Sequence, residues 1–242
     1  MRKAHILLFF ISFFFIAEPG TAQTNEETSG DTLPRIEKYG LRIGVDLAKP
    51  LRSLLESGYT GLEIMADFRV TKRFYAALEL GNEKKDWIES YVSSKTSGSY
   101  AKIGFDYNAY ENWLGMENSI NLGLRYGSST FDQTLLSYRI YTDNPAFPPE
   151  VVNTPIEFNN LTAHWVEFIF SVKTEVLNNL YLSINLQLKS KIAETQPHNF
   201  GNLYIPGFNR TYDYSEFGVG YGYSISYLIP IFKKRLYNSD EN

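Results

Sequence analysis

Hydrophobic and polar residues alternate along much of the chain, most clearly between Glu216 and Phe232. Because successive side chains of a strand point to opposite faces, this alternation predicts a β-strand. One predicted face is bulky and the other is small: the first carries Phe217, Val219, Tyr221, Tyr223, Ile225 and Tyr227, and the second Gly218, Gly220, Gly222, Ser224 and Ser226. Large side chains on the outer face and small ones on the inner face are typical of a narrow barrel whose apolar surface meets lipid.

Seven further stretches alternate in the same way, so that eight strands are predicted in all. The expected strands are 38–48, 59–70, 74–81, 100–110, 118–127, 161–175, 180–191 and 216–232. Between the first two we expect a connection in which Leu51–Ser57 forms one helical turn. The first part of segment 128–160 still alternates, which predicts a hairpin that continues past the membrane before a Pro-rich tip.

The connections between these strands alternate in length. Short links are expected at 71–73, 111–117 and 178–179, and long polar loops at 82–99, 128–160 and 192–214. Outer-membrane barrels show this asymmetry between short periplasmic turns and long outer loops. The predicted fold is therefore all-β: an eight-stranded antiparallel up-and-down transmembrane β-barrel with both termini on the periplasmic side.

The N-terminus has the pattern of an export signal. Arg2 and Lys3 precede an apolar run, Ile6–Ile16, and Gly20-Thr21-Ala22 supplies small residues for cleavage after Ala22. A membrane anchor is the alternative, but the run is shorter than the ~17–25 residues of a spanning helix. We expect a signal peptide (1–22), a flexible lead-in (23–38), a barrel (39–232) and a charged tail (233–242), in a protein of the outer membrane.

The composition excludes several kinds of partner and functional site. The net charge of −4 gives no reason to expect a nucleic-acid partner. The chain has no cysteine, which excludes disulfides, thiolate metal sites and a cysteine nucleophile. We expect no cofactor.

The signal segment, the eight alternating strands and the final GVGYGYSISY resemble the small eight-stranded outer-membrane β-barrel superfamily. Within it, the chain is similar to a Gram-negative outer-membrane β-barrel family of unknown function, over about Tyr39 to Phe232. The resemblance implies outer-membrane lipid and the barrel-assembly machinery as partners, and no established activity. Gly222, Ile225 and Tyr227 match the assembly signal of such barrels, although the chain continues past Phe232.

Charged residues of both signs occupy the inward positions of the predicted strands. They are Arg42, Asp46, Glu63, Asp67, Arg69, Glu79, Lys102, Asp106, Arg125, Glu167, Lys173 and Lys189. An unpaired buried charge is costly, so these groups are expected to pair. The expected result is a lumen plugged by a polar network, and a gated ion or proton path is the alternative.

The histidines give a weak indication of catalysis. His164 and His198 are expected near the outer rim, where Ser137, Ser215 and Asp213 are conceivable partners in a lipid A-modifying enzyme. No spacing specifies a base and nucleophile pair, so we predict no catalytic or metal-binding residue.

Aromatic residues are expected in two places. Aromatic residues near the strand ends predict an interfacial girdle, and ordinary strand composition is the alternative explanation. These residues are Tyr39, Tyr59, Phe74, Tyr75, Tyr107, Tyr110, Trp113, Tyr126, Trp165, Tyr181 and Tyr227. Aromatic residues of the outer loops favour recognition of a partner or glycan, and packing over the barrel mouth is the alternative. These residues are Phe131, Tyr138, Tyr141, Phe147, Phe158, Phe200, Tyr204, Phe208 and Tyr212.

The expected role is structural or surface recognition, without catalysis. A soluble lipocalin-like carrier of a hydrophobic ligand is the second hypothesis. It would need an apolar interior, whereas the predicted inward face consists of Gly, Ser and charged residues.

Overall fold

The computed structural model describes residues 35–110, 118–140, 142 and 150–236. Contacts divide the chain into two units, Met1–Leu33 and Pro34–Asn242, and all described residues belong to the second unit. The predicted signal peptide, its cleavage site, most of the lead-in, Trp113, Tyr141, Phe147 and the end of the tail lie outside the described residues.

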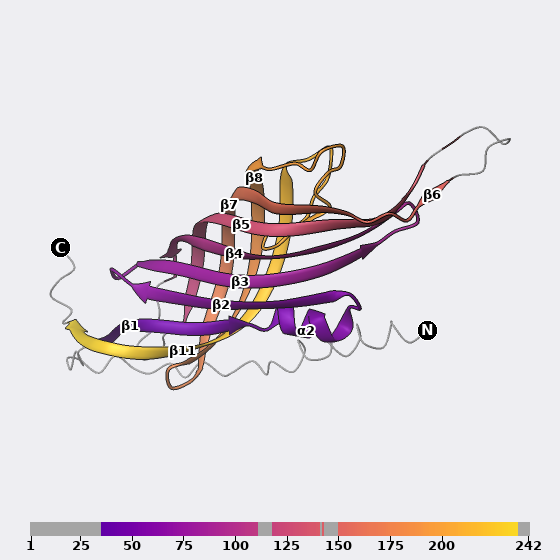
Figure 1. The fold of residues 1–242 in the computed structure, drawn as a ribbon. Coiled ribbons are helices and arrows are strands. Elements are labelled where there is room, and N and C mark those ends of the chain that lie inside the picture. Colours follow the sequence, from indigo (N-terminus) through magenta and orange to yellow (C-terminus); the bar gives the residue numbers. More distant parts are fainter. Residues whose placement is uncertain (1–34, 111–117, 141, 143–149, 237–242) are drawn as a thin grey trace, which may run out of the picture. The chain divides into compact units, whose positions relative to one another are not determined.

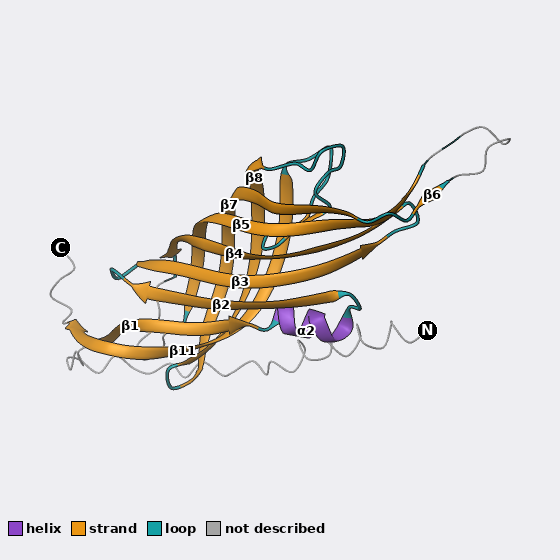
Figure 2. Ribbon diagram, in the orientation of Figure 1, coloured by secondary structure: helices purple, strands orange, loops and turns teal. Residues whose placement is uncertain are grey.

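Eight long strands make up most of the described chain (Figures 1 and 2). They are β1 (Arg35–Asp46), β2 (Tyr59–Arg69), β3 (Phe74–Ile88), β4 (Val92–Asn108), β5 (Ser119–Arg139), β7 (Ile156–Leu177), β8 (Leu180–Glu194) and β11 (Phe217–Leu236). The short elements are α2 (Ala48–Leu55), β6 (Val151–Val152), β9 (Tyr204–Ile205) and β10 (Asn209–Arg210).

The eight long strands pair in a closed ring. The order is β1-β2-β3-β4-β5-β7-β8-β11, and β11 pairs back onto β1. Every pairing in the ring is antiparallel. β6 extends the sheet beside the end of β5. The prediction of an all-β, eight-stranded antiparallel arrangement is therefore confirmed at the level of strand order and pairing.

No helix in the described part of the chain is both long enough and apolar enough to cross a membrane.

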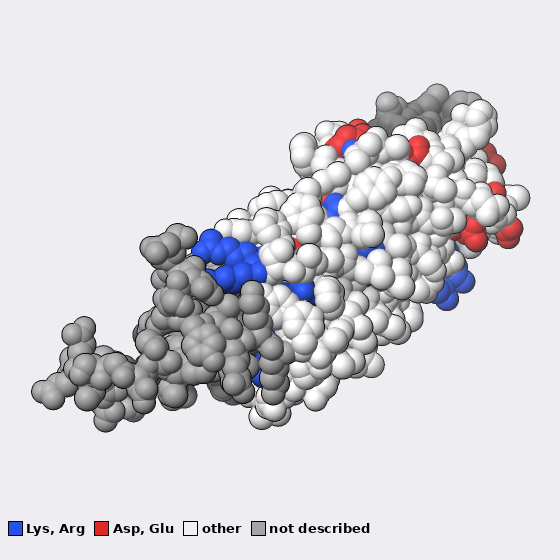
Figure 3. Space-filling view, turned by 90° about the vertical axis from the view of Figure 1, so that its left-hand side faces the viewer, with Lys and Arg blue, Asp and Glu red and all other residues white. Residues whose placement is uncertain are grey.

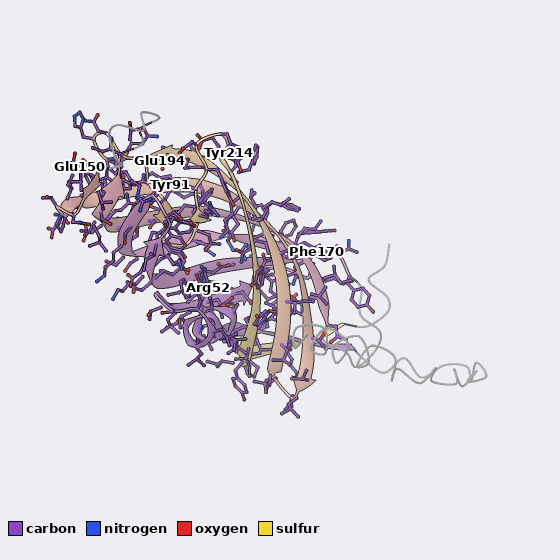
Figure 4. All side chains as sticks on the ribbon, turned by 90° about the vertical axis from the view of Figure 1, so that its right-hand side faces the viewer. Arg52, Tyr91, Glu150, Phe170, Glu194 and Tyr214 are labelled. Atoms are coloured by element: carbon purple, nitrogen blue, oxygen red, sulfur yellow. The ribbon has the colours of Figure 1, made fainter. Side chains whose placement is uncertain are left out.

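The strands have one buried polar face and one exposed apolar face. In β11, Ser224 and Ser226 are buried, whereas Tyr221 is 68% exposed and Val219 is 74% exposed. The two faces of this strand lie as its alternation predicts. Figure 3 shows one side of the outer surface, which is mostly white, with charged side chains gathered toward its ends. Phe170 of β7 is one of the apolar side chains that point outward (Figure 4).

The prediction of a polar loop over 82–99 is wrong. β3 continues to Ile88 and β4 begins at Val92, so that the two strands pair from Phe74↔Tyr107 to Ile88↔Ser93. Beyond Leu80 both faces of this hairpin carry polar residues, and hydrophobic alternation disappears although the backbone ladder continues. The predicted ends of the strands marked where the apolar outer surface ends, not where pairing ends.

The other predicted long connections are also partly strand. β5 runs to Arg139 and β7 begins at Ile156, so much of 128–160 belongs to the extended hairpin that the alternation indicated. The helical turn expected at Leu51–Ser57 overlaps α2, which starts earlier, at Ala48, and ends at Leu55. The tight links at 71–73 and 178–179 are present, and Asn179 adopts a positive φ of 66°.

The segment between β8 and β11 does not form a free loop. Its β9–β10 hairpin packs Tyr204, Ile205 and Phe208 into the ring, where each is at most 2% exposed. Ile205 and Phe208 form a core cluster with residues from β4, β5 and β7: Tyr100, Phe131, Leu161, Ala163, Trp165, Ile205 and Phe208. We call this end of the ring, opposite the 71–73 turn, the hairpin end.

A glycine makes room for the largest ring of this cluster. A Cβ atom on Gly127 would lie 2.2 Å from Cε2 of Trp165. We therefore expect Gly127→Ala to lower the free energy of unfolding by about 1–3 kcal/mol, as overpacked cores do. Urea unfolding of the refolded chain, followed by tryptophan fluorescence, measures this.

The matched control is Gly201→Ala, where the nearest atom to a new Cβ is 3.9 Å away. Equal stability of the two variants would contradict the packing of Trp165 against Gly127.

Candidate functional site

The charged residues predicted to face inward do gather inside the ring. Eleven of the twelve are buried, and the Asp67 side chain is 12% exposed. They come from all the strands of the ring except β11: Arg42 and Asp46 (β1), Glu63, Asp67 and Arg69 (β2), Glu79 (β3), Lys102 and Asp106 (β4), Arg125 (β5), Glu167 and Lys173 (β7) and Lys189 (β8). We call these residues the interior network.

Lys102 lies at the centre of the interior network. Its Nζ is 2.9 Å from Oε2 of Glu79, 3.3 Å from Oε2 of Glu63 and 3.6 Å from Oε1 of Glu167. The side chain is 1% exposed, and this buried cation pairs with carboxylates from three different strands. In a buried setting each of these charges depends on the others.

Further donors bind two of these carboxylates. The hydroxyl of Tyr100 donates to Oε2 of Glu63 at 2.5 Å. The indole Nε1 of Trp165 donates to Oε2 of Glu167 at 3.2 Å. Both rings belong to the core cluster, which links the apolar and the charged parts of the interior.

A second layer lies nearer the 71–73 turn. Arg125 bridges Glu79, at 3.1 Å from Nε, and Asp106, at 2.8 Å from Nη2. Asp67 accepts from Arg42 at 3.0 Å and from Lys173 at 2.7 Å. Each acid of this layer faces at least one cation, and Asp67 and Glu79 each face two. The arrangement joins six strands of the ring, from β1 to β5 and β7.

A third layer, at the hairpin end, was missed by the sequence analysis. Glu83 of β3 is completely buried, and it pairs with Lys49 of α2. Its Oε2 accepts from the Tyr204 hydroxyl at 2.6 Å and from the backbone N–H of Gly207 at 3.1 Å. Lys189 donates to the carbonyl of Gly207 at 2.7 Å. This layer ties the β9–β10 hairpin to the ring.

Sequence reading missed Glu83 because it fell in the segment taken for a loop. The period-two spacing from Glu79 through Gly81 to Glu83 was the signal available. Tyr204 and Lys49 gave no such signal, because they lie outside the long strands.

Two members of the interior network bind backbone groups. Asp46 accepts a hydrogen bond from the N–H of Lys49, at 2.9 Å, in the first turn of α2. Arg69 donates to the carbonyls of Thr71 and Lys72, at 3.2 and 2.9 Å, and so stabilises the turn between β2 and β3. Asp46 thus stabilises the connection from β1 to α2, and Arg69 stabilises the connection from β2 to β3.

The rim histidines are placed apart from their conceivable partners. His164 stacks on Tyr126 with a centroid distance of 6.0 Å, and its Nδ1 is 3.1 Å from the tyrosine hydroxyl. In residues 35–110, 118–140, 142 and 150–236 no hydrogen bond joins either histidine to Ser137, Ser215 or Asp213. The same residues contain no cluster of three or more His, Asp or Glu with the geometry of a metal site.

The prediction that certain aromatic residues lie at the surface is wrong for several of them. Trp165, Tyr181 and Tyr59, expected in an interfacial girdle, are at most 3% exposed, and Tyr39 is also buried. Of the expected loop aromatics, Phe131 and Phe208 are buried in the core cluster, and Tyr204 is buried as well. Inward and outward positions of a strand differ by one residue, and composition alone does not distinguish them.

Exposed aromatics remain at the hairpin end. Tyr91, in the turn between β3 and β4, is 64% exposed, and Tyr214 is 86% exposed (Figure 4). The Tyr212 and Tyr214 rings lie 5.4 Å apart, and the Arg210 guanidinium lies 5.0 Å from the Tyr212 ring.

The residues matched to an assembly signal lie in β11. Gly222 is buried, Ile225 is half-buried, and Tyr227 is exposed on the outer face. A Cβ on Gly222 would lie 2.6 Å from Oδ2 of Asp46, which gives this glycine a packing role as well.

Removing the cation at the centre of the interior network should be costly. Lys102→Met leaves Glu63, Glu79 and Glu167 without their shared partner, and breaking a buried ion pair costs roughly 3–5 kcal/mol. We expect the urea midpoint of the refolded chain to fall accordingly.

The control is Lys72→Met, which removes a cation from the exposed turn between β2 and β3 and should change stability by less than about 0.5 kcal/mol. If the two variants were equally stable, the interior network would not be holding the strands together.

Comparison with known proteins gives a family and no activity. No curated protein matches the chain. A family model described as "Domain of unknown function (DUF6048)" matches residues 5–234. Because this match covers nearly the whole sequence, the chain belongs to that family of unknown function.

Proposed function

We propose that this protein is an outer-membrane β-barrel with a plugged lumen, and that its role is structural or surface recognition through its outer loops. It is exported by its N-terminal signal, and its short turns, such as 71–73 and 178–179, face the periplasm. Its partners are outer-membrane lipid, the barrel-assembly machinery and an extracellular ligand or glycan.

The observation that carries this proposal is an apolar belt on the outside of the ring. Every strand contributes at least one exposed large apolar side chain: Ile43, Ile64, Leu80, Ile103, Leu124, Phe168, Leu186 and Val219. Ile103 and Leu186 are 63% and 62% exposed. Water-soluble monomers rarely expose contiguous apolar patches larger than a few hundred Å². A belt of this kind, around a charged interior, suits a ring that is immersed in lipid.

The interior network supports a plugged lumen. Lys102, Arg125 and Lys173 cross the ring to carboxylates on other strands. A cavity of about 50 Å³ beside Asp67, Arg125 and Lys173 has room for only one or two water molecules. Eight strands are also just enough for an interior filled by its own side chains.

The hairpin end supports a recognition role. Tyr91 and Tyr214 project from turns that extend beyond the apolar belt, and Arg210 lies against Tyr212. Aromatic rings and arginine are enriched where proteins bind partners. Phe131, Tyr204 and Phe208 are buried at the hairpin end, so these exposed side chains stand on a packed base.

The two alternative functions find less support. A lipocalin-like carrier needs an apolar cavity, whereas the interior holds paired charges such as Lys102–Glu79. A lipid A-modifying enzyme would need a base and a nucleophile in contact, and His164 instead binds Tyr126. We therefore propose no catalytic activity.

Electrophoretic mobility tests the membrane proposal. We expect the protein in urea-washed outer membranes to migrate differently in SDS gels before and after boiling, because a lipid-embedded ring of strands resists SDS until heated. The boiled sample is the control for the unfolded chain. A protein that stays in the soluble periplasmic fraction and shows no mobility shift would contradict the proposal and favour the lipocalin-like alternative.

Planar-bilayer recording tests the plugged lumen. The purified protein should give no stable single-channel steps of large conductance, because Lys102 and Arg125 with their carboxylates occupy the ring. A wide trimeric porin, inserted under the same conditions, is the positive control. Steps of porin size from the wild-type protein would show that the interior network does not close the lumen.

A further inference from the structure

The wall of the ring is incomplete at one place. β1 ends at Asp46, which pairs with Ser224 of β11. Toward the hairpin end, residues 217–223 of β11 pair only with β8, and residues 59–63 of β2 pair only with β3. Where β1 stops, the chain turns aside into α2 (Figure 1). Two strand edges are therefore left without a strand between them.

The edge of β2 is covered by the helical segment. The N–H of Gly61 donates to the hydroxyl of Ser53 in α2, at 2.9 Å. The N–H of Tyr59 donates to the carbonyl of Glu56, the residue that follows α2, at 3.3 Å. The backbone of this edge is thus bound within the chain, although β1 does not reach it.

Backbone hydrogen bonds show which residues of β11 face the break. The N–H of Lys191 donates to the carbonyl of Glu216, at 2.8 Å, so even-numbered positions on this side of the ladder bind β8. The N–H of Leu47 donates to the carbonyl of Tyr223, at 2.7 Å, so odd-numbered positions bind toward β1. This alternation is the regular pattern of antiparallel strands. Between 217 and 223, the odd-numbered residues therefore point their N–H and C=O groups into the break.

The edge of β11 is open. Among the residues that the structure describes, none forms a hydrogen bond with the N–H or C=O groups of Val219 and Tyr221. Natural sheets usually protect such an edge with lysine, proline, a β-bulge or a covering element. Residues 217–223 (FGVGYGY) contain neither lysine nor proline, and their pairing with β8 has no bulge. This edge is regular and unblocked, which suits it to pairing with another strand.

The open edge borders a cleft of about 1180 Å³. Val219 and Tyr221 of β11 line this cleft together with Leu51 and Leu55 of α2, so it lies between the strand edge and the helix. It is larger than ordinary small-molecule pockets, which measure about 300–1,000 Å³. The unpaired backbone groups are therefore accessible from a space that can hold an extended peptide.

The outer and inner parts of the cleft differ in polarity. Val219 and Tyr221 are 74% and 68% exposed on the outer face of the ring. Lys49 and Glu63 also line the cleft, and their charged groups lie 3.7 Å apart at the lumen. On a strand added to β11, side chains opposite Val219 and Tyr221 would point outward, and the alternate side chains would point inward. Apolar residues at the first positions and polar residues at the second would continue both faces of the ring.

We propose that this cleft binds an extended segment of a second protein, which joins β11 as an antiparallel strand in the place that β1 leaves empty. Backbone donors and acceptors that alternate at strand spacing select a polypeptide, because neither a lipid nor a sugar presents amide groups in that order. The segment has apolar side chains beside Val219 and Tyr221 and polar side chains toward the lumen. Because α2 lines the same cleft, the space suits one strand and not the ring of a second copy. This surface is separate from the loop aromatics Tyr91 and Tyr214.

Fluorescence anisotropy of the full-length, detergent-purified protein tests the site with a labelled synthetic peptide. In this peptide of about nine residues, an ordinary strand length, valine and threonine alternate between terminal lysines. Its valines should lie outward and turn their N–H groups to β11, because the outward residues of β11 are those that point their backbone groups into the break. N-methylation of the valines should weaken binding at least about tenfold, since several hydrogen bonds are lost. N-methylation of the threonines is the matched control and should leave binding unchanged.

Amide hydrogen exchange locates the bound peptide on the protein. Without peptide, the amides of Val219 and Tyr221 should exchange faster than those of Gly220 and Gly222, which bind β8. With peptide, exchange at Val219 and Tyr221 should slow at least about tenfold, and exchange at the two glycines should stay the same. Slow exchange at all four positions without peptide would show that the edge is already closed, and would overturn the proposal.

Proline substitution separates binding from folding. Val219→Pro removes an N–H that has no partner in the described chain, and proline is tolerated at a strand edge of this kind. Its urea midpoint should stay near that of the wild type, while peptide binding should fall by about fivefold or more. The matched control, Gly220→Pro, removes an N–H that binds β8 and should lower the urea midpoint. An equal fall in both variants would show that the N–H of Val219 is paired within the ring.

Other outcomes overturn the proposal in distinguishable ways. Absence of saturable binding of the unmethylated peptide would exclude strand addition, and equal binding of the two methylated peptides would mean contact without a backbone ladder. Protection of Val219 and Tyr221 that appears without peptide as the protein concentration rises would make a second copy the occupant. The heat-dependent gel shift, measured on the same samples, reports the membrane location separately from peptide binding.

Discussion

The contacts of Lys102 with Glu63, Glu79 and Glu167 join strands that lie on different sides of the ring. A closed ring of eight strands has an interior too narrow for bulk water, so charges placed there must be satisfied by one another. Much of the remaining architecture follows from this requirement. The second layer repeats it with Arg125 and Lys173, and the third layer uses it to attach the β9–β10 hairpin through Glu83.

The outer face of the ring carries apolar side chains instead of charged ones. Its backbone groups are paired around the ring, and its side chains are large and apolar from β1 to β11. In the membrane location proposed above, hydrocarbon would offer no hydrogen bonds, so the sheet would have to close on itself. The one interruption, where β1 stops at Asp46, is bridged by α2, and Asp46 itself binds the first turn of that helix. The break in the wall therefore has hydrogen bonds of its own.

The strand content and the inward or outward direction of most residues could be predicted from the sequence. Period-two alternation survives in any strand that separates a polar interior from an apolar exterior, as in β11 and β8. It fails where both faces meet water, which is why the ends of β3 and β4 were read as a loop. Aromatic residues were placed less well: Trp165 and Tyr181 suit a lipid interface by composition, yet both point inward.

The sequence by itself determined the alternating faces, the eight strands and the twelve inward charged residues, because each of these depends on local spacing along one strand. Only the tertiary structure decided which charges meet, since Lys173 of β7 and Asp67 of β2 are brought together across the ring and not by their spacing. It also decided that the 192–214 segment folds inward, because Tyr204 finds its partner Glu83 on a strand far away in sequence. The break in the wall beside α2 is of the same kind: it arises because β1 ends at Asp46 while β2 and β11 both extend further toward the hairpin end, and this offset becomes visible only when the strands are paired.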